Sequence, residues 1–216
     1  MVHNEVLRQL NAGTAALVKI IGIGMLALGV LLATLAEARA DSYPVDGGPD
    51  KGDHSFCFDP NYPMATAVRD RAVWTMDNNE GVEAQTVVNT VQKSSCGPHT
   101  DVRFQQRSLG EDYYGYAPCI LRNAGATTCD RRDVRFNWGE VREDATNDNF
   151  FARMNLCHEV GHTLGARHYA STSSSPDSDG MGGRINSCMI SGVHDSGALW
   201  TRSYGAHHRA HINNYF

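Results

Sequence analysis

The sequence predicts a protein of the α+β class, with helices and strands in one domain. Two segments, at residues 101–108 and 133–138, alternate apolar and polar residues with the period of a β-strand. Two others, at 65–76 and 148–164, carry apolar residues at helical spacing. The chain has 216 residues, of which 41% are hydrophobic and 20% charged. This length and composition are ordinary for one globular domain with a sizeable core.

The first 40 residues differ in composition from the rest of the chain. An apolar run at 20–36 follows two basic residues and ends at the Ala-Arg-Ala tripeptide of residues 38–40. A basic start, an apolar stretch and small residues at a cleavage site are typical of a secretory signal peptide. We therefore expect residues 1–40 to be removed and the mature domain, 41–216, to be secreted. The alternative is an uncleaved membrane anchor, although the run is shorter than the roughly 20 apolar residues that a span prefers.

The elements before the centre of the chain are expected in a simple order. Residues 41–63 are rich in Pro, Gly and Asp without any period, so we expect a loop or extended segment. The helical pattern at 65–76 is followed by a weaker one at 83–92, which predicts one long or two short helices. The strands at 101–108 and 133–138 come next.

Residues 148–164 form the clearest helix of the sequence. Asn147 or Asp148 can cap its N-terminus. Phe151 and Leu156 lie on its apolar faces and are expected in the core. We expect a loop at 171–183 after this helix and a second helix over 200–216 at the end of the chain.

Residues 158–168, which begin in the last part of the helix expected at 148–164, read His-Glu-Val-Gly-His-Thr-Leu-Gly-Ala-Arg-His. His158 and His162 are four apart, so on a helix both imidazoles leave the same face one turn apart. Glu159 then lies beside a metal bound by these rings and can serve as general base. Gly165 tolerates the positive φ that ends a helix, and the turn brings in His168 as third ligand. Three neutral imidazoles with one open position are typical of catalytic zinc, whereas a histidine-rich surface helix would explain neither the glycine nor the third spacing.

The pattern HExxHxxGxxH resembles the signature of the metzincins, zinc endopeptidases that also carry a methionine in a tight turn after the third histidine. Met189 is the preferred candidate for this methionine, because its competitor Met181 lies in a glycine-rich loop. The resemblance covers mainly residues 148–216. It implies that Met189 forms an apolar floor under the histidines, while the alternative is a methionine that fills a gap in the core.

The resemblance also implies a fold and an activity. The fold would be a mixed twisted sheet with flanking helices, an active-site helix, and an irregular C-terminal subdomain ending in a helix. One catalytic Zn²⁺ on the three histidines would activate water for peptide-bond hydrolysis, with Glu159 as general base. An extended peptide or protein substrate would add to an edge strand. Residues 101–108 and 133–138 are the candidate strands, and the second is favoured. Tyr169, which directly follows the third histidine, leaves the subfamily open.

Two other functions stay open at this point. The chain could be a zinc-binding but non-hydrolytic interaction protein, or a metal-dependent hydrolase of non-peptide amides. An intact Glu159 favours hydrolysis, because a purely structural site has no use for it. Asp177 and Asp179 suggest a Ca²⁺ site in the loop at 171–183, but the ligand pattern of a calcium-binding loop is missing, and a solvated loop is the alternative.

All six cysteines follow the predicted cleavage site, and an even number in an exported chain indicates disulfides. Cys119 and Cys129 bracket a short stretch that can close a loop. If the methionine turn lies beneath the histidines, Cys157 and Cys188 are close together. A metal-binding role for cysteine is disfavoured because no CxxC pair occurs. Pairing of the two remaining cysteines completes the set Cys57–Cys96, Cys119–Cys129 and Cys157–Cys188.

Charge excludes one class of partner. The chain has a formal net charge of −5 and no basic run, so we do not expect it to bind nucleic acid. Membrane contact is expected only through an uncleaved N-terminal segment, and a monomer is expected. His207, His208 and His211 cluster near the C-terminus, where a solvated helix is favoured over a second metal site. Cys57 or Asp53 could cap the zinc in a latent form, but a disulfide is favoured for Cys57.

Overall fold

The structure is a computed structural model, and the residues it describes are 43–77, 79–123, 125, 128–168 and 187–216. The segment predicted to be a signal peptide, residues 1–40, lies outside this part of the chain. The same holds for Met181 and for the calcium candidates Asp177 and Asp179. No helix in the described ranges is long and apolar enough to cross a bilayer.

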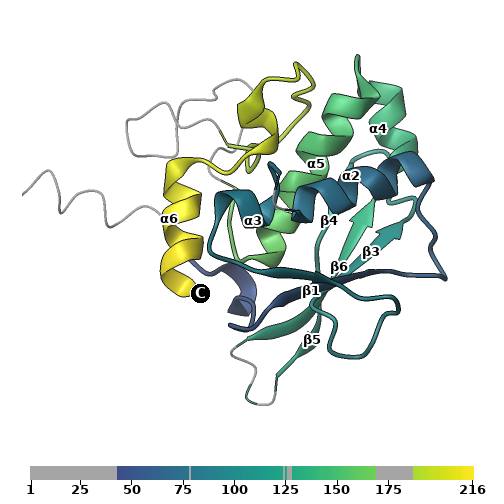
Figure 1. Ribbon diagram of the computed structural model, residues 1–216. Coiled ribbons are helices and arrows are strands. Elements are labelled where there is room, and N and C mark those ends of the chain that lie inside the picture. The colour runs from purple at the N-terminus through teal and green to yellow at the C-terminus, as the bar shows by residue number, and fades with distance from the viewer. Residues whose placement is uncertain (1–42, 78, 124, 126–127, 169–186) are drawn as a thin grey trace, which may run out of the picture. The chain divides into compact units, whose positions relative to one another are not determined.

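A six-stranded mixed sheet runs through the domain in the order β2-β1-β3-β6-β4, and β5 also pairs with β6 (Figure 1). β1, β2, β3 and β6 run parallel to one another, whereas β4 and β5 are antiparallel to β6. The strands are β1 (His54–Phe58), β2 (Thr90–Gln92), β3 (Val102–Gln106), β4 (Gly115–Tyr116), β5 (Cys119–Arg122) and β6 (Cys129–Phe136).

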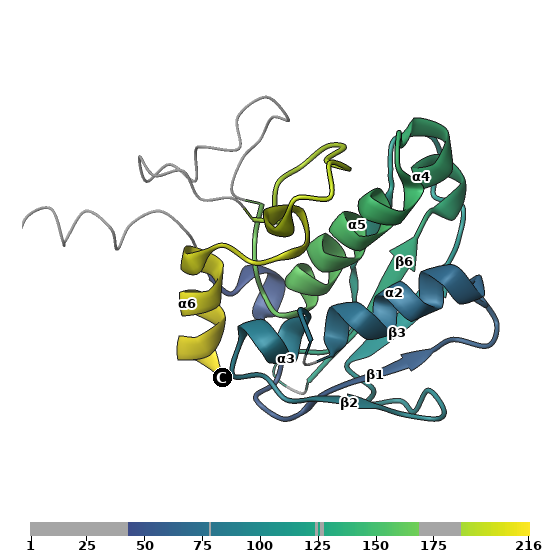
Figure 2. The same cartoon turned by 45° about the horizontal axis from the view of Figure 1, so that its top comes forward.

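Helices α2 and α5 cover one face of the sheet and pack against each other, as both views show (Figures 1 and 2). The apolar residues that alternate along β3 and β6 are buried in the core that these helices cover. A mixed sheet with flanking helices agrees with the predicted α+β class. The helices are α2 (Thr66–Met76), α3 (Val82–Gln85), α4 (Trp138–Asp144), α5 (Asp148–Thr163) and α6 (Ala206–Tyr215), with 3-10 helices η2 (Val45–Gly47) and η3 (Leu199–Arg202).

Helix α5 forms where the sequence predicts a helix. Asn147 is the N-cap, and its Oδ1 accepts a hydrogen bond of 3.1 Å from the backbone N–H of Phe150. Phe151 and Leu156 are fully buried, as expected for its apolar faces. The helix ends at a turn in which Gly165 has a φ of 88°, a conformation that favours glycine.

The expectations for the first half of the chain were met only in part. Residues 54–58 form strand β1 inside the segment expected to be a loop or an extended segment. Four consecutive residues of β1 are buried, so both of its faces are covered and it has no alternating pattern. The weak helical pattern at 83–92 produces only the short α3 followed by strand β2. Strands β4 and β5 and helix α4 were not predicted.

The C-terminal helix is shorter than expected. Residues 200–216 divide into the end of η3 and helix α6, and Tyr204 lies in the break between them. Tyr204 is buried, and its hydroxyl donates to the carbonyl of Cys157 at 3.2 Å. This contact ties the C-terminal segment to α5, which explains why the apolar spacing continues outside the helix.

All six cysteines are paired, and the three predicted pairings are confirmed. Three disulfides are typical of proteins from an oxidising compartment, which agrees with the expected export of the chain. The bridges are Cys57–Cys96, Cys119–Cys129 and Cys157–Cys188.

Candidate metal site

Three histidine rings meet at the C-terminal end of α5. His158 and His162 lie one turn apart on this helix, and His168 follows the turn at Gly165. The Nε2 atom of His168 is 2.8 Å from Nε2 of His158 and 2.9 Å from Nε2 of His162, and the remaining pair is 3.2 Å apart. Within the described residues, this is the one group of three or more His, Cys, Asp or Glu side chains that could hold a metal ion.

Hydrogen bonds at the other ring nitrogen fix the tautomer of two of these histidines. Nδ1 of His158 donates to the carbonyl of Cys188 at 2.8 Å, and Nδ1 of His162 donates to the carbonyl of Ala166 at 2.9 Å. Because a carbonyl oxygen only accepts, Nδ1 carries the proton in both rings. Nε2 of each neutral ring therefore keeps a free lone pair directed at the centre of the group.

A metal ion held by the three rings would account for this arrangement. Two Nε2 lone pairs cannot hydrogen-bond to each other, so their close approach has no explanation in bonds between the rings. Imidazole nitrogen binds zinc at about 2.0–2.1 Å, which spaces tetrahedral ligands about 3.3 Å apart, close to the distances found here. The residues thus fit a metal that prefers nitrogen ligands, a class that includes zinc, copper, nickel and iron.

Burial favours the protonation state that binds a metal. Burial, together with the two neighbouring rings, lowers the pKa of His158 well below its usual value. Burial and His168 lower the pKa of His162 to about 4, and burial also lowers the pKa of His168. The neutral form, which offers the lone pair, is therefore favoured at neutral pH.

The histidines line a cleft of about 850 Å³. Glu159 also lines it, as do residues around β4 on one side and Ile190 to Gly192 on the other. The carboxyl group of Glu159 is outside the group of three ligand side chains, and the residue is only 5% exposed. Burial raises its pKa to about 8, so this group holds a proton more readily than an exposed carboxylate does.

Strand β4 passes directly over Glu159. A Cβ atom at Gly115 would lie 2.6 Å from Oε1 of Glu159 and 2.7 Å from Oδ1 of Asn155. Asn155 is buried, lines the cleft, and has no described hydrogen-bond partner for Oδ1. Sequence analysis missed both residues. The available signals were a glycine among three tyrosines and an asparagine one helical turn before Glu159.

The edge strand at the cleft is β4, so the expected substrate strands were wrong. Residues 101–108 and 133–138 correspond to β3 and to the end of β6, and both strands have neighbours on each side. β4 pairs with β6 through Gly115 and Tyr116, and no strand in the described ranges covers its other edge.

Met189 is fully buried against α5. A Cβ atom at Gly161 would lie 2.2 Å from Sδ of Met189, so the thioether packs on the helix backbone between the first two histidines. The disulfide Cys157–Cys188 joins the residues that directly precede His158 and Met189. The segment around Met189 is thereby held against α5.

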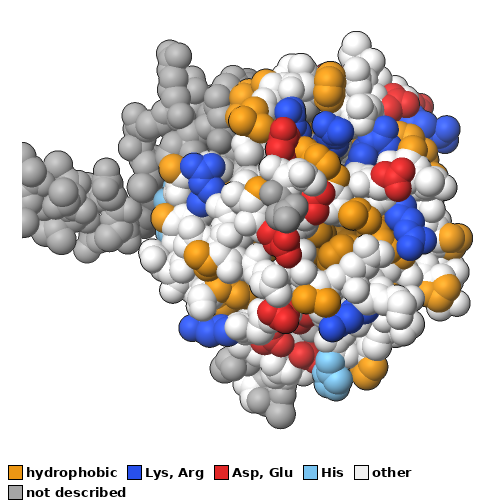
Figure 3. Space-filling view, viewed as in Figure 1, with side chains coloured by type: hydrophobic (Ala, Val, Ile, Leu, Met, Phe, Trp, Pro, Cys, Tyr) orange, Lys and Arg blue, Asp and Glu red, His pale blue; other side chains and the backbone are white. Residues whose placement is uncertain are grey.

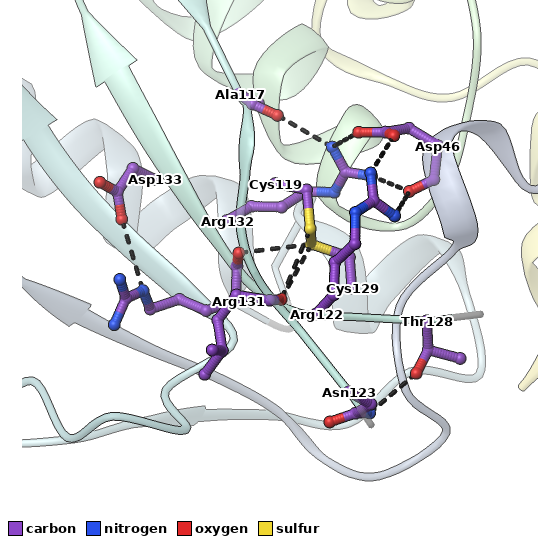
Figure 4. The surroundings of a disulfide bond; sticks show 11 residues. Asp46, Ala117, Cys119, Arg122, Asn123, Thr128, Cys129, Arg131, Arg132 and Asp133 are labelled. Carbon is purple, nitrogen blue, oxygen red and sulfur yellow. Dashed lines mark hydrogen bonds and ion pairs between the residues drawn. A yellow bond between two sulfur atoms is a disulfide. The ribbon is translucent and has the colours of Figure 1, made fainter. Parts of the chain in front are cut away.

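Arginine side chains surround an aspartate at another part of the cleft. Asp46 of η2 forms ion pairs with Arg122 and Arg132, next to the Cys119–Cys129 disulfide (Figure 4). Arg132 is buried and donates to the carbonyl of Ala117 at 3.0 Å. These contacts fasten the N-terminal part of the domain to the β5–β6 hairpin.

The C-terminal histidines are not all solvated, contrary to expectation. His208 is buried, with Nδ1 3.0 Å from Oγ of Ser187 and Nε2 3.2 Å from the carbonyl of Arg167. Arg167 and Ser187 directly precede His168 and Cys188 in the sequence. His208 therefore packs α6 against segments that shape the histidine cluster.

Comparison with known protein families gave no match, and no curated protein was found to be similar in sequence.

Proposed function

We propose that the chain is a zinc-dependent endopeptidase of the metzincin type. The observation that carries this proposal is the convergence of three Nε2 atoms beside a buried, uncoordinated Glu159. A structural zinc site is closed by four protein ligands, whereas three ligands and a neighbouring carboxyl group suit catalysis. The metzincin type rests on the HExxHxxGxxH sequence and on Met189, which we propose as the apolar floor of the site.

The residues of the cleft divide the proposed reaction between them. His158, His162 and His168 would hold Zn²⁺, which when bound polarises the scissile carbonyl and lowers the pKa of water to about 7. Glu159 would accept a proton from the attacking water and deliver it to the departing amine. Burial of Glu159 supports this role, because it stabilises the protonated form between the two transfers.

The edge of β4 suits an extended peptide. A strand with an open edge can form main-chain hydrogen bonds with a peptide added alongside it. Gly115 has no side chain to keep such a peptide away from Glu159. Tyr113 and Tyr116, which are 56% and 52% exposed, line the same cleft and offer aromatic contacts to the side chains of the substrate.

The substitution Glu159→Gln tests the proposal. It preserves the shape of the side chain but removes the proton acceptor, so cleavage of casein or of a peptide library should fall about 100-fold or more. Zinc content, measured by mass spectrometry of the purified protein, should stay at one ion per chain. His158→Ala should lose both the metal and the activity. Undiminished cleavage by Glu159→Gln would contradict the assignment.

The same assay separates the alternatives. A zinc-binding protein without hydrolytic activity would retain the metal but cleave nothing, and a hydrolase of other amides would act only on non-peptide substrates. Export is proposed as well, on the basis of the three disulfides and the N-terminal sequence pattern. N-terminal sequencing of protein from the culture medium should begin at Asp41.

A further inference from the structure

A second cavity lies between α2 and α5, away from the histidine cluster. Its volume is about 370 Å³, and both views show the two helices side by side (Figures 1 and 2). Asn149 and Arg153 precede His158 and His162 by nine residues each, and nine steps of about 100° place them on the opposite side of α5. The cavity is lined by Ala67, Asp70, Arg71, Trp74, Asn149 and Arg153.

Two guanidinium groups in this cavity form no ion pair in the described residues. The guanidinium of Arg153 lies 4.6 Å from the centre of the Trp74 ring, and its Nε atom is buried without a hydrogen-bond partner. Nε of Arg71 donates to Oδ1 of Asn149 at 2.6 Å. Asp70, the only acidic residue of the lining, forms no ion pair with either arginine within the described residues, although its charge and that of Asp148 act on Arg71 from a greater distance.

The positive charges act on each other. Burial, followed by the nearby charge of Arg153, lowers the pKa of Arg71, and the charges of Asp70 and Asp148 offset part of this repulsion. Asn149 lies in the first turn of α5, where the helix dipole adds further positive potential. Several Lys and Arg side chains, with Asp and Glu side chains among them, lie over the upper part of the face that carries α2 and α5 (Figure 3). An anion bound between the two arginines would relieve this repulsion.

We propose that this cavity binds the anionic group of a small ligand, a phosphate or a carboxylate, between Arg71 and Arg153. Guanidinium groups match both anions because their parallel N–H donors form paired hydrogen bonds. The volume lies within the usual range for small-molecule pockets, and Trp74 and Ala67 supply an apolar wall for the body of the ligand. This inference does not depend on peptide hydrolysis.

Nuclear magnetic resonance titration of the mature protein tests the site. Inorganic phosphate and acetate are added separately at constant ionic strength, with chloride as reference. The indole N–H signal of Trp74, assigned with Trp74→Phe, should shift and saturate with at least one of the two anions. Trp138 and Trp200 lie outside the cavity lining, so their signals serve as internal references.

Substitutions of the arginines test whether the anion binds in this cavity. Arg71→Gln and Arg153→Gln should each weaken binding about tenfold or more, because each removes a charge-assisted contact. Arg69→Ala is the matched control, since Arg69 is also on α2 but stacks on Phe58 at 4.4 Å outside the cavity. It should bind like the wild type. The proposal is overturned if neither anion produces a saturable shift at Trp74, or if both glutamine variants bind with unchanged affinity.

Discussion

Because Gly115 is a glycine and has no side chain, strand β4 can lie close to Glu159, the proposed general base. The position of its absent Cβ is 2.6 Å from Glu159 and 2.7 Å from Asn155, closer than side-chain atoms normally approach. We expect Gly115→Ala to displace both groups and to reduce peptidase activity at least about tenfold, while overpacking costs roughly 1–3 kcal/mol of stability. Peptide cleavage and urea unfolding measure the two effects.

Gly139 provides the matched control for this substitution. It lies in α4, and the nearest atom to an added Cβ would be Oδ1 of Asn137, at 3.7 Å. Gly139→Ala should leave activity unchanged and stabilise the fold by about 0.5–1 kcal/mol, because alanine favours a helix over glycine. Equal activity of the two alanine variants would refute the importance of the close approach at β4.

His54 links the stability of the domain to pH. Oγ1 of Thr163 donates to the carbonyl of Val160, so it accepts from Nε2 of His54 at 2.8 Å. Nδ1 of His54 is then unprotonated, buried, and without a described partner. Burial lowers the pKa of His54 from 6.5 to about 4, with smaller effects from the facing charges of Asp50 and Arg132.

Acid should therefore destabilise the protein through His54. Above pH 6.5 the ring is neutral in both the folded and the unfolded state, and its contribution does not change. As pH falls from 6.5 toward about 4, only the unfolded state takes up the proton, and the free energy of unfolding decreases by about 3 kcal/mol.

The variant His54→Gln isolates this effect, because glutamine can still donate to Thr163 but does not titrate. Urea unfolding at several pH values in the presence of a chelator, which removes the contribution of bound metal, gives the comparison. The variant should lose less stability than the wild type between pH 6.5 and 4. Parallel curves for the two proteins would exclude His54 as the source.

At the scale of the elements, sequence periodicity predicts those that bury one face. The patterns locate helix α5, strand β3 and the end of strand β6, although β6 begins earlier, at Cys129, and Trp138 belongs to α4. β1 is covered on both faces, and β4 has two residues, so neither presents a period. The spacing of the motif predicts the relative positions of the three histidines and Glu159, because one helix and one turn carry them all.

The remaining parts of the candidate site come from tertiary structure. Gly115 approaches Glu159 only because β4 pairs with the end of β6, a contact between distant segments. The carbonyl of Cys188 orients His158, and the sequence contains no signal for a backbone acceptor. Local patterns thus identify the groups that react, while long-range packing determines what surrounds them.

The disulfide Cys157–Cys188 connects two such segments, and its removal should affect the metal site. Replacing both cysteines by serine opens a crosslink between residues 31 apart in sequence, which should cost roughly 3–4 kcal/mol if loop entropy dominates. It also releases the backbone carbonyl that accepts from His158, so we expect zinc affinity to fall about 10–100-fold. Calorimetry and competition with a zinc indicator measure the two quantities.

The Cys119–Cys129 bridge is the control. It links residues 10 apart on β5 and β6, and its removal should cost slightly less stability, about 3 kcal/mol. No atom of this bridge contacts the histidine cluster, so zinc affinity should remain unchanged. An equal loss of zinc affinity in both double variants would show that general destabilisation, not the link to His158, is the cause.

At the scale of the whole domain, the histidine cluster holds together segments that are distant in sequence. Tyr43 near the start of the described chain donates to the carbonyl of Leu164 at 2.6 Å, and His208 of α6 contacts the carbonyl of Arg167. His168 lies directly after these contacts and carries the third proposed ligand atom. A metal on the cluster would therefore crosslink the end of α5 to the segment on which both ends of the domain pack.

Removal of the metal should consequently lower the stability of the entire domain. With free zinc at about 100 times its dissociation constant, binding stabilises the folded state by about 2.7 kcal/mol. Addition of a chelator should thus lower Tm by roughly 5–10 °C for a domain of this size. In His162→Ala the chelator should have little further effect, because the ligand set is already incomplete, whereas Glu159→Gln should respond like the wild type. If chelation left the Tm of the wild type unchanged, the three rings would not be bound to a metal in the purified protein, and the proposed hydrolysis would lose its basis.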